Sequence, residues 1–240
     1  GLSAAIKLKQ LTKEANKDLS VCVIEKGSEV GAHIVSGAVI ETKALDELIP
    51  DWKSKNSPLK TEAKDDKFLY LTETKSYQLP TPPQMHNKGN YIISLSDFTK
   101  WLAQQAEELE VEIYPGFAAS EVLFDDKNKV IGVATSDMGR LKDGSEGPNF
   151  ERGIELRAKQ TIFSEGCRGH LGKILMEKYN LNSDNSPQTY GIGIKELWEV
   201  TPENSKPGSI MHTTGWPLDN DTYGGSFLYH LDNNKVSIGF

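Results

Sequence analysis

The first 17 residues place apolar side chains at helical spacing, at Leu2, Ala5, Ile6, Leu8 and Leu11. This spacing predicts a helix. A Val-rich apolar run over residues 19–24 follows and predicts a parallel strand that is buried on both faces. A helix that leads into such a strand makes up two thirds of a βαβ unit. The start of the chain therefore predicts an α/β domain.

The rest of the chain alternates between helical, strand and loop patterns. Helical patterns occur at 43–49 and at 97–109, with Ser96 as a candidate N-cap, and Glu165-Gly166 leads into a third helix that ends at Tyr179. Strand patterns occur at 68–71, 76–79, 111–114, 155–158 and 160–163, with a hairpin of 119–125 and 130–135. Residues 54–67 and 143–149 are predicted to be loops. From residue 189 the chain is strand-rich, so the fold class is mixed α/β.

Composition excludes several classes of protein. The 27 Lys and Arg residues against 34 Asp and Glu give a net charge of −7, which argues against broad nucleic-acid binding. No unbroken apolar run exceeds four residues, so the sequence predicts no membrane-spanning helix. Two cysteines, Cys22 and Cys167, cannot supply the four ligands of an iron–sulfur cluster or of a Cys-only zinc site.

Both ends of the sequence stop inside a regular pattern. The chain opens at Gly1 in helical sequence, without an initiator Met or a leader, and closes on a strand-like run. We therefore expect a fragment of a longer protein.

Two segments carry the spacing of a dinucleotide site. Glu25 lies 24 residues after Gly1 at the end of a Val-rich strand, where an acidic side chain can bind ribose hydroxyls; an ordinary helix–strand pair with a surface Glu fits equally well. The second segment, TIFSEGCRG at 161–169, places an acid and glycines between a strand and a helix, where backbone can approach a cofactor. Taken together, they favour a cofactor site over routine turns.

Other candidate residues point less clearly to chemistry. Gly224 and Gly225 expose backbone N–H groups, but a hairpin turn explains them better on these residues alone. Cys167, at a helix start, could be a nucleophile, but no base is placed beside it by the sequence. The histidines lack metal-ligand spacing and are interpreted as isolated, hydrogen-bonded side chains; they are His33, His86, His170, His212 and His230.

Read together, seven segments resemble one family, electron transfer flavoprotein–ubiquinone oxidoreductase. They keep the order and spacing of the family over nearly the whole chain: GLSAAIKLKQL, VCVIEK, GAHIVSGAVI, GNYIISLSDFTKWLAQQAEELEVEIYPG, FSEGCRGHL, PQTYGIGIKELWEV and GWPLDNDTYGGSFLYHL. The resemblance implies a glutathione-reductase-like FAD-binding domain with an inserted, strand-rich ubiquinone-binding domain. Residues 1–40 and 97–184 would form the FAD-binding domain, 41–96 an inserted quinone and membrane segment, and 185–240 part of the ubiquinone-binding domain.

The same resemblance implies site residues. Those expected to bind FAD are Gly1, Leu2, Ser3, Glu25, Lys26, Gly31, Ala32, Ser36, Gly37, Val122, Glu165 and Gly166. Tyr223, Gly224 and Gly225 are expected to bind ubiquinone, which reverses the preference for a hairpin turn at the paired glycines. No catalytic acid or base is expected, because the cofactor carries the chemistry.

The resemblance also implies partners and a location. Electrons would come from reduced electron transfer flavoprotein and reach ubiquinone through FAD and a [4Fe–4S] cluster whose ligands lie outside this chain. The protein would lie on one leaflet of the mitochondrial inner membrane, on the matrix face, or of a bacterial inner membrane. Candidate membrane segments are 30–49, which fits core equally well, and 68–85. Alternatives are a flavoprotein reductase of the geranylgeranyl reductase or FixC type, and a non-catalytic subunit of a respiratory complex.

Overall fold

The computed structural model describes residues 1–35 and 37–240, so Ser36, one of the predicted FAD-binding residues, lies outside the described residues. The chain forms two compact units. Unit 1 comprises Gly1–Val30 and Gln105–Thr189, and unit 2 comprises Gly31–Gln104 and Tyr190–Phe240. The domain boundaries expected after residues 40, 96 and 184 stay a prediction, because compactness is a different criterion from membership of a domain family.

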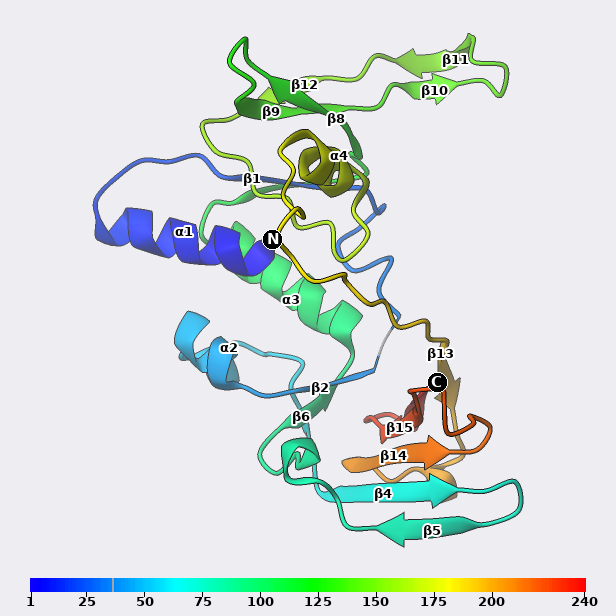
Figure 1. Cartoon of the computed structure of the whole chain (residues 1–240). Coiled ribbons are helices and arrows are strands. Elements are labelled where there is room, and N and C mark those ends of the chain that lie inside the picture. The colour runs from blue at the N-terminus through cyan, green and yellow to red at the C-terminus, as the bar shows by residue number, and fades with distance from the viewer. Residues whose placement is uncertain (36) are drawn as a thin grey trace. The chain divides into compact units, whose positions relative to one another are not determined.

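Unit 1 opens with helix α1 (Leu2–Glu14), which leads into strand β1 (Cys22–Glu25) (Figure 1). β1 pairs in parallel with β7 (Glu112–Pro115), as its apolar pattern predicts. Burial on both faces was wrong: Cys22 is exposed and the rest of β1 is half-buried. Within the described residues this sheet has two strands, so each strand has only one hydrogen-bonded neighbour. Ala5 and Ile6 of α1 are buried, with Ile6 fully inaccessible, whereas Leu11 at the far end of the apolar side is exposed by 48%.

The second part of unit 1 is a three-stranded antiparallel sheet. The hairpin of β8 (Ala119–Phe124) and β9 (Val130–Thr135) is confirmed, and β12 (Glu155–Arg157) pairs with the other edge of β9. Helix α4 (His170–Lys178) packs on β8, where the rings of Tyr179 and Phe124 lie 6.3 Å apart.

Two predictions in this part of the chain were wrong. The expected loop over 143–149 contains most of β11 (Glu146–Glu151), which pairs with β10 (Met138–Arg140) as a two-stranded ribbon. The strand expected at 160–163 does not form, and residues 158–169 are irregular because no neighbouring strand pairs with them. The helix expected after Glu165 and Gly166 is confirmed, and it begins at His170.

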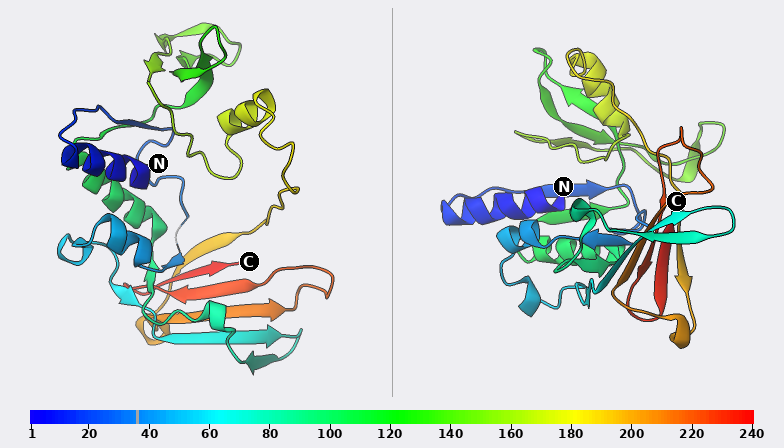
Figure 2. Two further views of the ribbon diagram at one scale, coloured as in Figure 1. Left: turned by 60° about the vertical axis from the view of Figure 1, so that its left-hand side comes forward. Right: turned by 60° about the horizontal axis from the view of Figure 1, so that its bottom comes forward.

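The main element of unit 2 is a six-stranded sheet (Figure 2). Its strand order is β13 (Lys195–Glu199), β16 (Lys235–Gly239), β15 (Ser226–His230), β14 (Ser209–Gly215), β4 (Asp65–Leu71) and β5 (Ser76–Leu79). β14 and β4 are parallel, whereas the other pairs are antiparallel. Strands from the first and last thirds of the chain therefore share one sheet.

A smaller antiparallel sheet completes unit 2, in the order β2 (Ala38–Ile40), β6 (Tyr91–Ile93) and β3 (Thr61–Glu62). The expected loop over 54–67 was therefore wrong in its second half, which contains β3 and the start of β4. A core of Ile92, Ile210 and Leu231 lies in this unit, with Tyr229 packed against it. These apolar contacts join strands that are distant in sequence.

Helices and single turns complete the described elements. They are α2 (Lys43–Leu48), α3 (Leu95–Glu107), and the 3₁₀ turns Trp52–Ser54, Pro83–Met85 and Pro202–Asn204. The cap of α3 differs from the expectation: the hydroxyl of Ser94, not Ser96, accepts the N–H of Asp97 at 3.2 Å. Ser96 instead donates to the carbonyl of Gly31 at 2.9 Å.

Candidate functional site

The start of α1 contains the first three residues predicted to bind FAD. Gly1 precedes the helix, and its carbonyl oxygen accepts a hydrogen bond from the N–H of Ala5 at 3.0 Å. Leu2 and Ser3 occupy the first turn. No acidic residue lies in that turn, so nothing opposes the positive end of the helix dipole. Backbone N–H groups at such a terminus bind phosphate without further side chains.

Glu25 is the last residue of β1 and is held by the turn that follows it. Its Oε1 accepts the N–H of Gly27 at 2.7 Å, and its carbonyl accepts the N–H of Phe117 at 3.0 Å. The side chain is half-buried, whereas Lys26 is exposed. The carboxylate is therefore oriented at the end of a parallel strand, where dinucleotide folds bind ribose.

The segment before α4 lies beside the start of α1. A Cβ added to Gly1 would lie 3.5 Å from the Cβ of Ser164, so the two candidate glycine turns of unit 1 are neighbours. Gly166 has a φ of +79°, and a Cβ there would meet nothing within 4 Å. The positive φ of Gly166 favours glycine at this position, although the space beside it is open.

The side chain of Glu165 caps a helix. Its two carboxylate oxygens accept the N–H groups of Leu171 at 3.2 Å and of Gly172 at 2.7 Å, and His170 Nδ1 lies 3.6 Å from Oε1. The sequence pattern placed this acid in a turn that leads into the helix and assigned it to a cofactor, so it did not indicate the capping role. Because both carboxylate oxygens of Glu165 already accept backbone N–H groups, a contact of this residue with a flavin would have to use its backbone atoms.

The other predicted FAD residues lie apart from this turn. Val122 is half-buried in β8 and pairs with Val133. Gly31, Ala32 and Gly37 belong to unit 2, where Ala32 is exposed. A Cβ at Gly37 would lie 1.9 Å from Ser237 Oγ, so this glycine is needed for packing inside unit 2.

An apolar pocket of about 580 Å³ lies in unit 2. It is lined by Val35, residues 191–195, Gly225, Phe227 and Phe240. Of the three residues predicted to bind ubiquinone, only Gly225 lines it: Gly224 is adjacent in sequence, and the Tyr223 side chain is fully exposed. Lys195 and Phe227 were not predicted; the Lys195 Nζ lies 5.5 Å from the centre of the Phe227 ring.

Gly225 is sterically fixed. A Cβ there would lie 2.2 Å from the backbone oxygen of Thr213, which cannot move without breaking the sheet. A Cβ at Gly224 would meet only the Cδ1 atom of Leu218, at 2.7 Å. The two glycines therefore differ in how well they tolerate a side chain. At Gly225 a Cβ would collide with the backbone of the neighbouring strand, whereas at Gly224 it would meet a side chain that can move.

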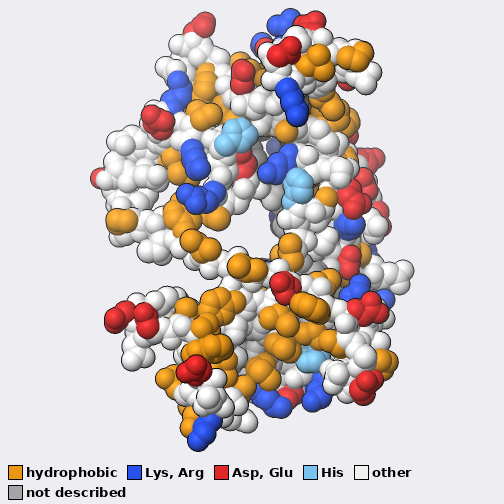
Figure 3. Space-filling model, turned by 90° about the vertical axis from the view of Figure 1, so that its right-hand side faces the viewer, with side chains coloured by type: hydrophobic (Ala, Val, Ile, Leu, Met, Phe, Trp, Pro, Cys, Tyr) orange, Lys and Arg blue, Asp and Glu red, His pale blue; other side chains and the backbone are white. Residues whose placement is uncertain are grey.

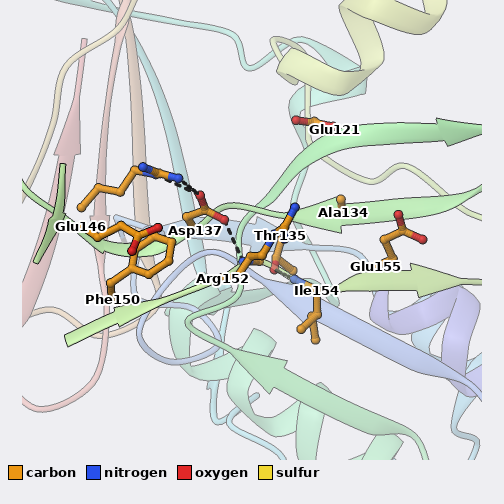
Figure 4. A pocket seen from close by; sticks show the side chains of 11 residues that line it. Glu121, Ala134, Thr135, Asp137, Glu146, Phe150, Arg152, Ile154 and Glu155 are labelled. Atoms are coloured by element: carbon orange, nitrogen blue, oxygen red, sulfur yellow. Dashed lines mark hydrogen bonds and ion pairs between the residues drawn. The ribbon is translucent and has the colours of Figure 1, made fainter. Parts of the chain in front are cut away.

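A second, polar pocket of about 420 Å³ lies in unit 1 beside β9 and the β10–β11 ribbon (Figure 4). Asp137 organises it, because its carboxylate accepts the N–H of Gly153 at 2.9 Å and Nε of Arg140 at 2.9 Å. These bonds lower the pKa of Asp137, the Gly153 N–H most of all. None of the predicted site residues lines this pocket.

Exposed aromatic side chains gather at one end of the six-stranded sheet, and Figure 3 shows apolar side chains concentrated over unit 2. Tyr70 and Tyr77 are cross-strand partners, exposed by 40% and 49%. Trp216, exposed by 52%, donates its backbone N–H to Leu71. By contrast, Leu45 and Ile49 of the other candidate membrane segment are buried, so this part of it forms core.

The described residues contain no group of three or more His, Cys, Asp or Glu side chains suited to a metal ion. Cys22 and Cys167 form no disulfide and are both exposed. No described helix has the length and apolar character needed to cross a membrane.

Comparison with known proteins decides the relationship. Residues 190–240 match the family model "ETF-QO, ubiquinone-binding". The whole chain is 60% identical to the mitochondrial electron transfer flavoprotein–ubiquinone oxidoreductase of Dictyostelium discoideum, of which it covers 39%. The chain matches electron transfer flavoprotein–ubiquinone oxidoreductase over its whole length. The resemblance inferred from the sequence is therefore confirmed.

Other relatives of the same name extend this finding. The chain is 55% identical to the enzyme of Pseudomonas aeruginosa, covering 44% of it, and 53% identical to the mitochondrial enzyme of Homo sapiens, covering 39%. Both alignments include 100% of this chain. The chain thus spans roughly two fifths of the length of these curated relatives.

Solved structures support the fold. A geranylgeranyl bacteriochlorophyll reductase-like protein of Thermoplasma acidophilum aligns over 100% of this chain and 54% of its own, with a TM-score of 0.65 and 15% identity. A flavoprotein/dehydrogenase of Cytophaga hutchinsonii aligns over 100% and 53%, with a TM-score of 0.58 and 14% identity. The mixed α/β fold of a flavoprotein with a strand-rich part is confirmed. At such low identity these structures do not favour the reductase alternative as a function.

Proposed function

We propose that this chain forms FAD- and ubiquinone-binding parts of an enzyme that transfers electrons from reduced electron transfer flavoprotein to ubiquinone. One observation carries the proposal. The apolar pocket that contains Gly225 and Phe227 is formed mostly by residues within 190–240, the segment that matches the ubiquinone-binding family model. A concave apolar pocket with a few polar groups is the usual form of a site for a small apolar ligand.

The residues of unit 1 fit an FAD. The N-terminus of α1, with Gly1, Leu2 and Ser3, offers backbone N–H groups to a pyrophosphate. Glu25 accepts a turn N–H through Oε1, which leaves Oε2 as the oxygen for ribose hydroxyls. We assign the open backbone at Gly166, together with Lys26, Val122 and the backbone of Glu165, to the same cofactor. Gly31, Ala32, Ser36 and Gly37 stay predictions for the flavin end.

When bound, FAD supplies the redox chemistry of the reaction. The residues of the chain hold and orient the reactants. The backbone N–H of Gly225 is the proposed hydrogen-bond donor to a quinone carbonyl, with Gly224 and Tyr223 beside it. Apolar side chains such as Val35, Phe227 and Phe240 would bind the ring by excluding water. Lys195 adds a positive charge at the pocket, which favours the increase in negative charge on a quinone as it is reduced.

The residues of this chain do not fit a [4Fe–4S] cluster. A cluster of that kind needs four cysteine thiolates, and the chain has two cysteines. No electron-transfer step through a cluster is therefore derived from these residues.

The aromatic end of the six-stranded sheet supports contact with a membrane surface. Tyr70, Tyr77 and Trp216 combine apolar rings with polar tips, the side-chain type enriched at the lipid–water boundary. We propose that the protein lies on one leaflet of a membrane through this end. By analogy with the relatives named above, we propose the matrix face of the mitochondrial inner membrane, or the inner membrane of a bacterium.

FAD binding is tested with full-length protein carrying Glu25→Ala. Removing a charged acceptor costs about 1.5–3 kcal/mol, so FAD affinity of the apoprotein should fall about tenfold or more. Glu25→Gln keeps an acceptor for the Gly27 N–H and should lose less affinity. Lys17→Ala, at an exposed position between α1 and β1, serves as the control. Equal FAD affinity of Glu25→Ala and the wild type would contradict the assignment.

A further inference from the structure

Phe227, on β15, lines the apolar pocket of unit 2, and its neighbours hold its ring in place. The ring stacks on the ring of Tyr229, with centres 4.4 Å apart and planes at 24°. Nζ of Lys195 lies 5.5 Å from the centre of the Phe227 ring. The cross-strand partner, Gly239, leaves room for the ring, since a Cβ there would lie 2.1 Å from Phe227 Cε1. The sheet therefore holds an aromatic ring in one orientation at the wall of the pocket.

Tyr229, which supports this ring, is itself anchored. Nε2 of His212, on β14, lies 2.9 Å from the hydroxyl oxygen of Tyr229, and the two rings lie 5.5 Å apart at 77°. Tyr229 also packs against the apolar core of unit 2. Tyr229 and His212 are not among the residues that line the pocket. They support the Phe227 ring from behind, so its orientation depends on the interior of the unit.

The other side of the Phe227 ring faces Gly225. Residues two apart on a strand lie next to each other on one face of the sheet. Tyr229 follows Phe227 by two positions and covers one side of its ring, whereas Gly225 precedes Phe227 by two positions and has no side chain. Gly225 and Phe227 both line the pocket. The side of the ring that Tyr229 leaves uncovered therefore borders the space of the pocket.

The spacing along β15 fits a further ring. Two residues advance a strand by about 6.6 Å, and aromatic rings stack with their centres about 4.5–7 Å apart. A flat ring whose carbonyl accepts the N–H of Gly225 therefore lies within stacking range of Phe227. Another part of the pocket wall leaves room for such a ring, because a Cβ added to Gly191 would meet nothing within 4 Å.

We propose that Phe227 is the surface on which the quinone ring stacks beside Gly225, and that Tyr229 is its positioning residue. This inference rests on the proposed function, which places a quinone in this pocket, and it assigns the orientation of the quinone ring to one side chain. The quinone, Phe227 and Tyr229 form a continuous aromatic stack. A flat ring gains this contact and an aliphatic chain does not, so Phe227 makes the pocket selective for flat rings that carry a carbonyl group.

Phe227→Leu tests the stack in full-length holoenzyme, since it keeps an apolar side chain and removes the ring. Reoxidation of the chemically reduced flavin is followed by absorbance at increasing concentrations of a soluble ubiquinone analogue, which gives a half-saturating concentration and a limiting rate. A stacked aromatic pair is worth about two- to twelvefold in affinity beyond burial, so the half-saturating concentration should rise by that factor at a wild-type limiting rate. Phe227→Tyr keeps the ring and should keep the wild-type value.

Two further comparisons separate stacking from a general structural effect. Phe68→Leu makes the same substitution in the same cross-strand row, on β4 and outside the pocket, and should leave the half-saturating concentration unchanged. Tyr229→Leu removes the ring behind Phe227 and should raise this concentration, whereas Tyr229→Phe should not. Ferricyanide takes one electron and has no ring, so it should reoxidise the flavin of every variant at the wild-type rate.

An unchanged half-saturating concentration in Phe227→Leu, an equal rise in Phe227→Tyr, or an equal loss of rate with the quinone and with ferricyanide would overturn the stack. If Phe227→Leu does not bind FAD, Phe227→Met takes its place with the same expected results, because a flexible Met side chain fills the space of the ring. A wild-type flavin that ferricyanide reoxidises and the quinone does not would instead overturn the proposed function, and the stack with it.

Discussion

The carboxylate of Glu165 accepts the backbone N–H of Gly172 at 2.7 Å, so an acid in a glycine turn fixes the start of helix α4. A second oxygen accepts the N–H of Leu171, and the helix packs on β8 beyond it. The turn next to Gly1 is therefore held in shape by one side chain. Removing this side chain therefore disturbs the turn while the backbone atoms of Glu165 and Gly166 are retained.

Loss of this cap should destabilise unit 1. Replacing a capping side chain by Ala costs about 1 kcal/mol, so Glu165→Ala should lower the apparent thermal midpoint of the full-length protein by a few degrees. Scanning calorimetry measures this. The control is Glu177→Ala, near the end of the same helix. Glu177 takes no part in the cap, so this variant should leave the thermal midpoint nearly unchanged. A midpoint in Glu165→Ala equal to that of the control would contradict the capping role.

The paired glycines should respond differently to the same substitution. In Gly225→Ala the new Cβ collides with the Thr213 oxygen, so the variant should lose thermal stability. In Gly224→Ala the Cβ meets only the end of Leu218, so the fold should survive while the segment next to Gly225 has to shift slightly. We expect Gly224→Ala to raise the KM for a ubiquinone analogue severalfold at a wild-type thermal midpoint. An unchanged KM would argue against the assigned quinone position.

The aromatic end of the sheet should contribute to membrane binding. Trp216 and Trp198 are exposed by 52% and 54%. Trp216 directly follows β14, whereas Trp198 lies on β13, the edge strand opposite β5, and its Nε1 donates to the carboxylate of Glu196. Burying half of an indole is worth at least about 1.4 kcal/mol, so Trp216→Ala should weaken binding of the full-length protein to lipid vesicles roughly tenfold. Trp198→Ala should bind as the wild type does in vesicle co-sedimentation. Equal losses in both variants would refute this orientation.

Asp137 should give the β10–β11 ribbon an acid-sensitive anchor. Its pKa is lowered in the folded chain by Gly153 and Arg140, so its stabilising contribution is present above its ordinary pKa and is lost as pH falls through the lowered value. Asp137→Asn should therefore reduce the thermal midpoint at pH 7, and the difference from wild type should shrink below about pH 4. Asp126→Asn, in the neighbouring turn, is the control. A difference that grows in acid would contradict the assignment.

Local sequence patterns predicted the segments that depend on their own residues. The helix from Leu2, the parallel strand ending in Glu25 and the β8–β9 hairpin follow from apolar spacing and turn residues. The ribbon at 138–151 was missed because its pattern of Gly, Pro and charges is that of a loop, and pairing with its own second strand overrides that preference.

The site was harder to predict where it depends on register. Gly225 was identified through resemblance, but Lys195 and Phe227 were not, because only the pairing of three strands, β13, β16 and β15, places them in one row. Gly37 was interpreted as a cofactor residue, although Ser237, distant in sequence, already requires a glycine there. Such relations arise from tertiary packing, and no local pattern encodes them.

The most direct test of the central claim is reduction of a ubiquinone analogue by reduced electron transfer flavoprotein, catalysed by purified full-length protein that contains this chain. We expect a yellow protein with a bound-flavin spectrum, and formation of quinol at a rate that depends on the analogue concentration. A flavin-free preparation, or a flavin-loaded protein that forms no quinol under these conditions, would contradict it.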